Sequence, residues 1–287
     1  MSNITQGIMI ADLTTGWWKP VKQDKILRKE VADWKKTNEE LLRVGKNLFP
    51  RKQIPEAYSA VTGAFGRARD KHNELTAPWN GDGGRLLKAA FHFEYNNKMR
   101  EHRRECQHAW DSFKIVFPEL KEWSRSLMPQ IFNEADWPDE RKLEKSFKFK
   151  LEFFPFPDAA KWILDVSELE MQALREQTEE SVKERLGEAM QEAYRRLFEA
   201  IKHMVDRLNS DSEEIHSSVV ENVRKACQLV PVLNFTNDEA LDDLRVAIEA
   251  GLTAFTSDQL SAVGHLRITV AARAAEIAAE LESRVAA

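Results

Sequence analysis

The chain has 287 residues, enough to bury a sizeable core, and its 31% charged residues with only 11 glycines favour solvated helices over a β-sandwich or barrel. The 43% hydrophobic content and eight tryptophans exclude a wholly disordered chain. No run of about 18 apolar residues could span a membrane, and residues 1–16 lack a signal-peptide pattern, which predicts a cytoplasmic protein without membrane contact. Cys106 and Cys227 are far apart and are expected to be reduced thiols.

The net charge of -5 is unevenly distributed along the chain. Residues 165–287 contain 24 acidic and 13 basic residues, a net of -11, whereas residues 1–164 have a net of +6. All eight tryptophans also precede Asp165. This asymmetry predicts an aromatic, basic α+β domain over 1–164 and an acidic helical region over 165–287, each with its own partners.

Two segments of the first domain have strand patterns. Residues 8–14 form a short apolar run before a turn-like segment with Gly16, and residues 147–153 alternate strictly between large apolar and charged side chains until Pro155. Because a single strand leaves its backbone unsatisfied, we expect the two segments to pair in a small sheet. Helices are expected on that sheet, near residues 24–47, 55–75, 85–116 and 118–133.

The second domain has the periodicity of long helices. Residues 166–209 lack proline, and a stripe of apolar residues recurs every three or four positions at Leu186, Met190, Ala193, Leu197, Ile201, Met204 and Leu208. After a turn at 209–214, helices are expected near 212–229, 238–254 and 257–285. The last helix carries a second stripe at Val263, Leu266, Val270, Ala274, Ile277 and Leu281.

These patterns predict a mainly α chain, with an N-terminal helical domain containing a small β-sheet and then a long antiparallel helical bundle or coiled coil. The two stripes should bury each other, within the chain or across a homodimer. The alternative is that the first stripe is an exposed docking surface for another protein, formed by Leu186, Met190, Leu197, Ile201 and Leu208.

One short segment could hold a metal ion. His102, Glu105 and Cys106 are spaced so that they share one face of a helix, and all three are zinc-ligand types. His108 lies about 240° around the helix from His102, so the segment is not the HExxH motif of zinc enzymes. The alternative interpretation is a solvated, basic helix face.

The glycine-rich loop at residues 80–85 could direct backbone N–H groups and Arg85 toward a phosphate. The loop lacks the Gly-Lys-Ser/Thr ending of a P-loop and follows no predicted strand. Asn-Gly and Gly-Gly pairs are turn formers, so a plain turn between helices is the alternative.

A third candidate is a basic, aromatic segment. Nine bases lie between residues 60 and 104, against five acids, and they alternate with aromatic residues such as Phe65, Trp79 and Tyr95. Cations near stackable rings are typical of single-stranded nucleic-acid binding, whereas buried rings beneath a solvated charged face are the alternative. The nine bases are Arg67, Arg69, Lys71, Arg85, Lys88, Lys98, Arg100, Arg103 and Arg104.

The early strand with residues 15–18 (TGWW), the helices that follow and residues 150–158 (KLEFFPFPD) resemble a domain-of-unknown-function family, numbered thirty-one-fifty, of tailed phages and conjugative elements. Its members tend to be encoded near a MoxR-type AAA+ ATPase. The resemblance implies an accessory role in a phage or mobile element within the bacterial host cytoplasm, and it implies no catalytic residue or cofactor.

Three functions are therefore expected as alternatives. The first is a non-enzymatic adaptor that contacts proteins, among them a AAA+ ATPase, through the C-terminal helices. The second is a single-stranded nucleic-acid-binding protein of phage DNA metabolism or recombination. The third is a metal-dependent enzyme centred on His102, Glu105 and Cys106.

Overall fold

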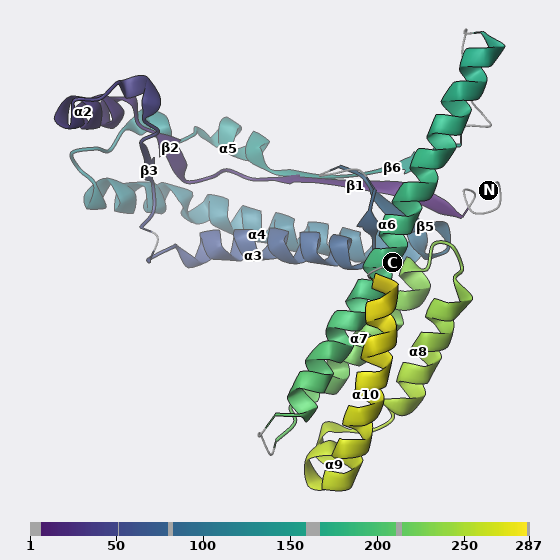
Figure 1. The fold of residues 1–287 in the computed structure, drawn as a ribbon. Coiled ribbons are helices and arrows are strands. Elements are labelled where there is room, and N and C mark those ends of the chain that lie inside the picture. The colour runs from purple at the N-terminus through teal and green to yellow at the C-terminus, as the bar shows by residue number, and fades with distance from the viewer. Residues whose placement is uncertain (1–6, 51, 80–82, 159–166, 211–213, 286–287) are drawn as a thin grey trace. The chain divides into compact units, whose positions relative to one another are not determined.

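A computed structural model describes residues 7–50, 52–79, 83–158, 167–210 and 214–285 (Figure 1). The chain is mainly helical with a small antiparallel sheet, which confirms the predicted fold class. Within the described ranges, no helix combines the length and the apolar character that crossing a membrane would require.

The elements up to residue 155 mix short strands with helices. They are β1 (Ile8–Gly16), β2 (Val21–Gln23), α2 (Lys25–Lys35), η1 (Glu39–Leu41), β3 (Gly45–Asn47), α3 (Glu56–Glu74), β4 (Ala77–Pro78), β5 (Arg85–Lys88), η2 (Ala89–Phe91), α4 (His92–Leu127), η3 (Glu134–Asp136), α5 (Glu140–Ser146) and β6 (Lys148–Pro155). The rest is helical, with α6 (Glu168–Leu208), α7 (Ser217–Leu233), α8 (Glu239–Gly251), α9 (Ser257–Ala262) and α10 (Gly264–Val285).

The main sheet has the order β4-β5-β1-β6. The two strands predicted from sequence, β1 and β6, are neighbours in it, as expected. Strand β5 pairs antiparallel with β1, Ile8 opposite Lys88 and Ala11 opposite Arg85. The predicted start of a helix at residue 85 is therefore wrong. Residues 85–88 form the strand that pairs with β1, and α4 begins at His92.

Two other helices differ from their predicted bounds. The helix expected over 24–47 ends at Lys35, since Lys36 adopts a left-handed conformation with φ 50° and caps the helix. The break expected before Pro118 is absent, and α4 continues to Leu127. Proline removes one intrahelical hydrogen bond, but α4 is held on both sides of it. Trp110, Phe113 and Phe117 are buried before Pro118, and after it Ser124 is buried and donates to the carbonyl of Leu48 at 2.7 Å.

The C-terminal helices follow the prediction with smaller shifts. Helix α6 matches the expected helix, and its start is fixed by a capping box between Ser167 and Glu170. Helix α7 begins at Ser217, and residues 211–213 of the expected turn lie outside the described residues. The last predicted helix is divided into α9 and α10, because Val263 is extended and Gly264 follows it.

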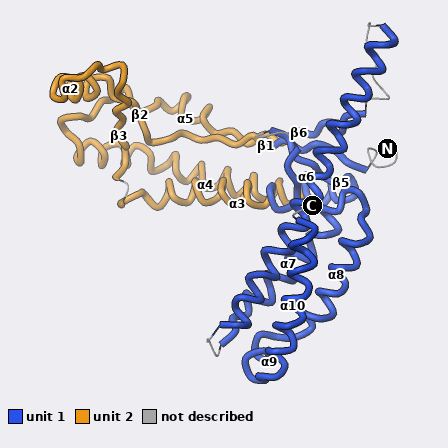
Figure 2. The backbone as a smooth tube through the Cα atoms, in the orientation of Figure 1, with its two compact units in different colours: residues 1–12, 72–96, 152–287 blue, residues 13–71, 97–151 orange. Residues whose placement is uncertain are grey.

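The chain divides into two compact units (Figure 2). Unit 1 contains residues 1–12, 72–96 and 152–287, and unit 2 contains residues 13–71 and 97–151. This division differs from the boundary expected at residue 164. Residues 72–96 belong with the bundle because Arg196 of α6 donates to the carbonyls of Asn73 and Glu74, at 2.9 and 2.8 Å, and Lys88 donates to the carbonyl of Pro231 at 3.3 Å.

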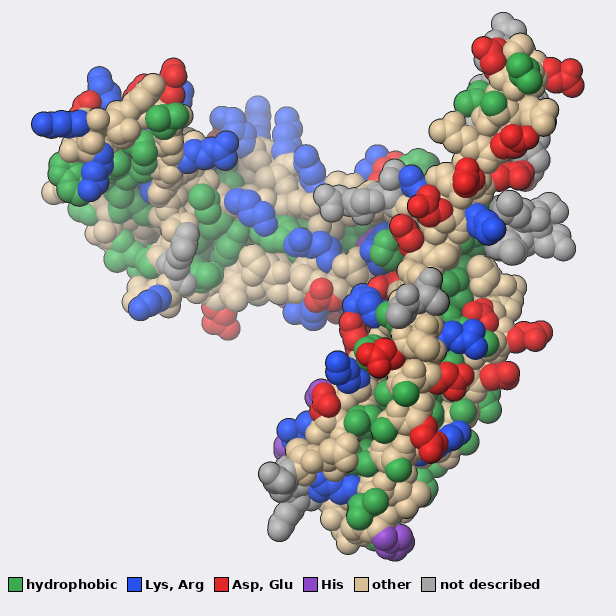
Figure 3. All heavy atoms as spheres, viewed as in Figure 1, with side chains coloured by type: hydrophobic (Ala, Val, Ile, Leu, Met, Phe, Trp, Pro, Cys, Tyr) green, Lys and Arg blue, Asp and Glu red, His purple; other side chains and the backbone are tan. Residues whose placement is uncertain are grey.

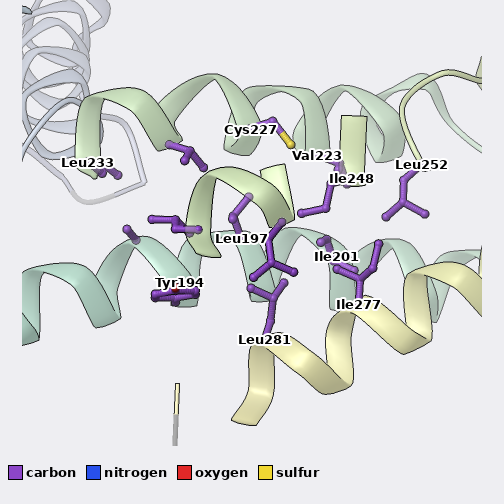
Figure 4. Packing of buried hydrophobic residues seen from close by; sticks show 14 of the residues in the cluster. Tyr194, Leu197, Ile201, Val223, Cys227, Leu233, Ile248, Leu252, Ile277 and Leu281 are labelled. Atoms are coloured by element: carbon purple, nitrogen blue, oxygen red, sulfur yellow. The ribbon is translucent and has the colours of Figure 1, made fainter. Parts of the chain in front are cut away.

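The core of unit 1 lies between α6, α7, α8 and α10, whose apolar side chains face one another (Figure 4). Leu197 and Ile201 of α6 are 1% and 0% exposed, and Ile277 and Leu281 of α10 are equally buried. The two predicted stripes therefore pack against each other within one chain. Unit 2 has an aromatic core instead, in which Trp18 contacts the rings of Phe49, Tyr58, Phe113, Phe117 and Trp137.

Candidate nucleic-acid interface

The two units differ more in charge than the two halves of the sequence do. Unit 2 contains 26 Lys plus Arg against 17 Asp plus Glu, a net of +9, and unit 1 contains 16 against 30, a net of -14. On the face shown in Figure 3, Lys and Arg are spread over unit 2, whereas Asp and Glu follow α6 and also lie over the other helices of unit 1. Unit 2 thus carries the excess positive charge that contact with an anionic polymer would need.

Three arginines of α4 belong to the exposed part of this basic surface. Arg100, Arg103 and Arg104 are exposed, and none of them makes an ion pair with another described residue. At 100° per residue they span an arc of about 100° around the helix. Met99 and Cys106 are fully buried on the neighbouring face of α4, about 40° and 60° around the helix from Arg103, so the arc of arginines borders the core.

Helix α3 supplies two more of the predicted bases. Arg67 Nη2 lies 3.6 Å from the Glu105 carboxylate, in an exposed ion pair that is worth little in water. The Arg69 guanidinium lies 5.0 Å from the centroid of the Trp17 ring, and Lys19 Nζ lies 3.0 Å from the same ring. Burial, followed by the positive charge of Arg69, lowers the pKa of Lys19 to about 8. Two like charges are therefore held close together beside the Trp17 ring.

The structure does not bring all nine predicted bases together. Lys71 and Lys98 belong to unit 2 and are partly buried. Arg85 and Lys88 belong to unit 1, where Arg85 Nε donates to Thr76 Oγ1 at 2.7 Å and Lys88 donates to Asn237 Oδ1 at 3.2 Å. Arg85 and Lys88 thus stabilise the fold of unit 1 and are removed from the candidate interface.

The suggested metal ligands do not converge on a site. His102 Nδ1 lies 3.3 Å from the Glu105 carboxylate, but Cys106 is fully buried on the core side of α4. Burial, followed by the charge of Glu105, raises the pKa of Cys106 to about 11, as expected for a thiol enclosed by the fold. No group of three His, Cys, Asp or Glu side chains within the described ranges could hold a metal ion.

The candidate phosphate loop is only partly described, since residues 80–82 lie outside the described residues. Gly84 precedes β5 and packs against β1 so closely that a Cβ atom there would overlap Ile10 Cγ2. The glycine is therefore needed for the approach of the two strands.

The candidate docking residues of α6 are interior. Leu186, Met190, Leu197, Ile201 and Leu208 are 0–8% exposed and belong to the core of unit 1. The interpretation of this stripe as an exposed docking surface is corrected, because α7 and α10 cover it.

Sequence reasoning missed a buried charged cluster in unit 2. Lys46 of β3 lies 2.9 Å from Asp24 Oδ2 and 2.8 Å from Asp136 Oδ2, and it donates to the carbonyl of Ile131 at 2.6 Å. The cluster lies beside a cavity of about 430 Å³ between α2 and the segment before η3. The three charged residues are too far apart in sequence to give a signal.

Two exposed apolar side chains on α2 were also missed. Ile26 is 72% exposed and Trp34 is 74% exposed, although both types are normally at least half buried. The sequence did indicate a solvated helix here, because residues 25–36 include five Lys or Arg.

No protein-family model matches the chain, and neither the curated proteins nor the solved structures contain a match.

Proposed function

We propose that the chain is an accessory adaptor whose unit 2 binds single-stranded nucleic acid. The observation that carries this proposal is the separation of charge into a unit with a net of +9 and a unit with a net of -14. A polyanion is attracted to unit 2 and repelled by unit 1, so unit 2 is the part of the chain that would bind it. The exposed arginines of α4 supply phosphate contacts, and the resemblance to a phage family points to DNA metabolism or recombination as the setting.

Binding of this kind is tested by its salt dependence. Each phosphate that a base neutralises on a single strand contributes about 0.7 to the slope of log K against log salt concentration. Replacing Arg100, Arg103 and Arg104 together by Ala should lower the slope by about 2 and weaken binding to a fluorescent oligo-dT of 30 nucleotides, measured by anisotropy.

A matched control removes the same charge from unit 1. Lys183, Lys202 and Lys225 are exposed there, and their joint replacement by Ala should leave the slope unchanged. Wild-type protein that fails to bind the oligonucleotide even at low salt would remove the proposal. Equal losses in the two triple variants would show that only the net charge of the chain matters.

A second candidate function, protein contact through unit 1, is favoured by the N-terminal part of α6. The first buried residue of α6 is Val182, and residues 168–181 extend beyond the helices of the bundle (Figure 1). This segment has five acids against one base, and Leu169 is 80% exposed. These first turns of α6 bury no residue of their own, so a partner that covers them would stabilise them. The resemblance suggests a AAA+ ATPase.

The experiment is capture by the tagged full chain from element-bearing cells, with the proteins identified by mass spectrometry. Replacing Glu176, Glu179 and Glu180 by Lys should abolish recovery of a stoichiometric ATPase. A control variant with the three exposed acids of α10, Glu276, Glu280 and Glu282, replaced by Lys should retain it. Capture that is insensitive to the α6 substitutions would exclude this segment as the contact.

A further inference from the structure

Helix α2 of unit 2 contributes little to the core. Ala32 is its one buried residue, Leu27, Arg28 and Val31 are half-buried, and its other side chains are exposed. Trp34 is 74% exposed, and every other described tryptophan is buried or half-buried. A tryptophan left in solvent gains little from folding, so its place on this surface is not explained by the stability of the unit.

The helix is nevertheless firmly attached. Asp24 caps it by accepting hydrogen bonds from the backbone N–H groups of Ile26 and Leu27, at 3.1 and 3.0 Å. The other carboxylate oxygen of Asp24 pairs with the buried Lys46, which also pairs with Asp136. Trp34 is therefore presented on an element whose position is fixed by a cap and by buried charges, as a binding platform requires.

The helix that carries Trp34 is basic overall, although Glu30 lies one turn before Trp34 on the same side and Lys25 lies on the opposite side. Residues 25–36 contain two acids, Glu30 and Asp33, against five bases, Lys25, Arg28, Lys29, Lys35 and Lys36. Lys35 Nζ lies 3.9 Å from the centroid of the Trp34 ring. With 74% of the residue exposed, the ring remains available to a ligand. An exposed ring beside cations is the arrangement that stacks a base and neutralises its phosphate.

We propose that Trp34 stacks a nucleobase of a bound single strand, with the bases of α2 contacting the neighbouring phosphates. This inference rests on the proposed nucleic-acid function and extends its interface from the arginines of α4 to α2. The competing explanation is that Trp34 and Ile26 dock an apolar surface of another protein. Stacking requires an aromatic ring, whereas apolar docking accepts any large hydrophobic side chain.

The test compares Trp34→Leu, Trp34→Phe and Ile26→Ala in the full chain, with oligo-dT and with an abasic oligonucleotide of the same length as probes. Trp34→Leu should weaken binding to oligo-dT between about 5- and 150-fold, the usual effect of one stacked base. The salt slope should not change, because Trp34 is neutral. Trp34→Phe should retain most of the affinity, and Ile26→Ala should bind like wild type.

The abasic probe separates base stacking from phosphate contact. It keeps the phosphates and lacks the bases, so wild type and Trp34→Leu should bind it equally. Trp34→Leu that binds oligo-dT within twofold of wild type would overturn the inference while leaving the proposed function intact. An equal loss on the abasic probe, or an equal loss in Ile26→Ala, would also overturn it. Absence of wild-type binding at low salt would remove the inference together with the proposed function.

Discussion

Replacing Lys46 by Met should destabilise unit 2 strongly, because two carboxylates would then share a buried site without a counter-charge. The Lys46 side chain is 6% exposed, and those of Asp24 and Asp136 are 12% and 16% exposed. Each carboxylate lies within 2.9 Å of the same ammonium nitrogen. Removing one partner of a buried ionic group typically costs about 3–5 kcal/mol, and we expect a loss in this range at pH 7.

The loss should depend on pH in a defined direction. The backbone N–H of Leu27 is the main cause that lowers the pKa of Asp24, with Lys46 next, so Asp24 stays ionised in the variant. Asp136 then faces Asp24 without a counter-charge. The destabilisation is therefore largest where both carboxylates are ionised, and it shrinks as the pH falls below about 4, where carboxyl groups also become protonated in the unfolded chain.

Urea unfolding, monitored by tryptophan fluorescence, reports on the stability of unit 2. Six of the seven described tryptophans belong to unit 2, namely Trp17, Trp18, Trp34, Trp110, Trp123 and Trp137. Adding Asp136→Asn to Lys46→Met removes the unpaired charge and should recover more than half of the lost free energy. A Lys46→Met variant within about 0.5 kcal/mol of wild type would refute the reasoning, as would a double variant no more stable than the single one.

Two further predictions concern unit 1. Leu197→Ala should lower the free energy of unfolding by about 2–5 kcal/mol, because Leu197 is 1% exposed between α6, α7 and α10; unchanged thermal stability would contradict the observed packing. The ring of His72 is buried with Nδ1 2.6 Å from the Tyr95 hydroxyl, and burial, followed by Arg85, lowers its pKa to about 4. Since the unfolded chain binds this proton near pH 6.5, stability should fall from pH 6.5 to 4, and His72→Phe should flatten that dependence in urea titrations.

The fold was predictable where the signal was local and repeated. The stripe through Leu197 recurs every three or four residues over several turns, and its pairing with the stripe through Ile277 follows from helix geometry. The alternation in β6 was equally direct. By contrast, β5 has four residues, Arg85 to Lys88, too few to show a period, and it is a strand because β1 offers it an edge. Tertiary pairing overrides such weak local preference.

The unit boundaries were not predictable from composition. Residues 72–96 lie in the middle of the basic half of the sequence, yet they belong to the acidic unit. The bonds that hold them there are single contacts from Arg196 to the carbonyls of Asn73 and Glu74 and from Lys88 to that of Pro231. Contacts of this kind join residues more than 100 positions apart and leave no periodic pattern in the sequence.

The role of each basic residue depends on its burial rather than on its place in the sequence. Arg85 and Arg100 were grouped by sequence, but Arg85 is bonded to Thr76 within unit 1 and Arg100 faces solvent on unit 2. Lys46 is buried and fixes α2, whereas Lys35, on that same helix, lies beside an exposed ring. A charge that is satisfied inside the fold cannot also neutralise a phosphate, so the interface must be formed by the bases that packing leaves in water. This is why the separation of charge becomes larger once the chain is divided by its contacts, and why the candidate surface moves from residues 67–104 as a block to α2, α3 and α4 of unit 2.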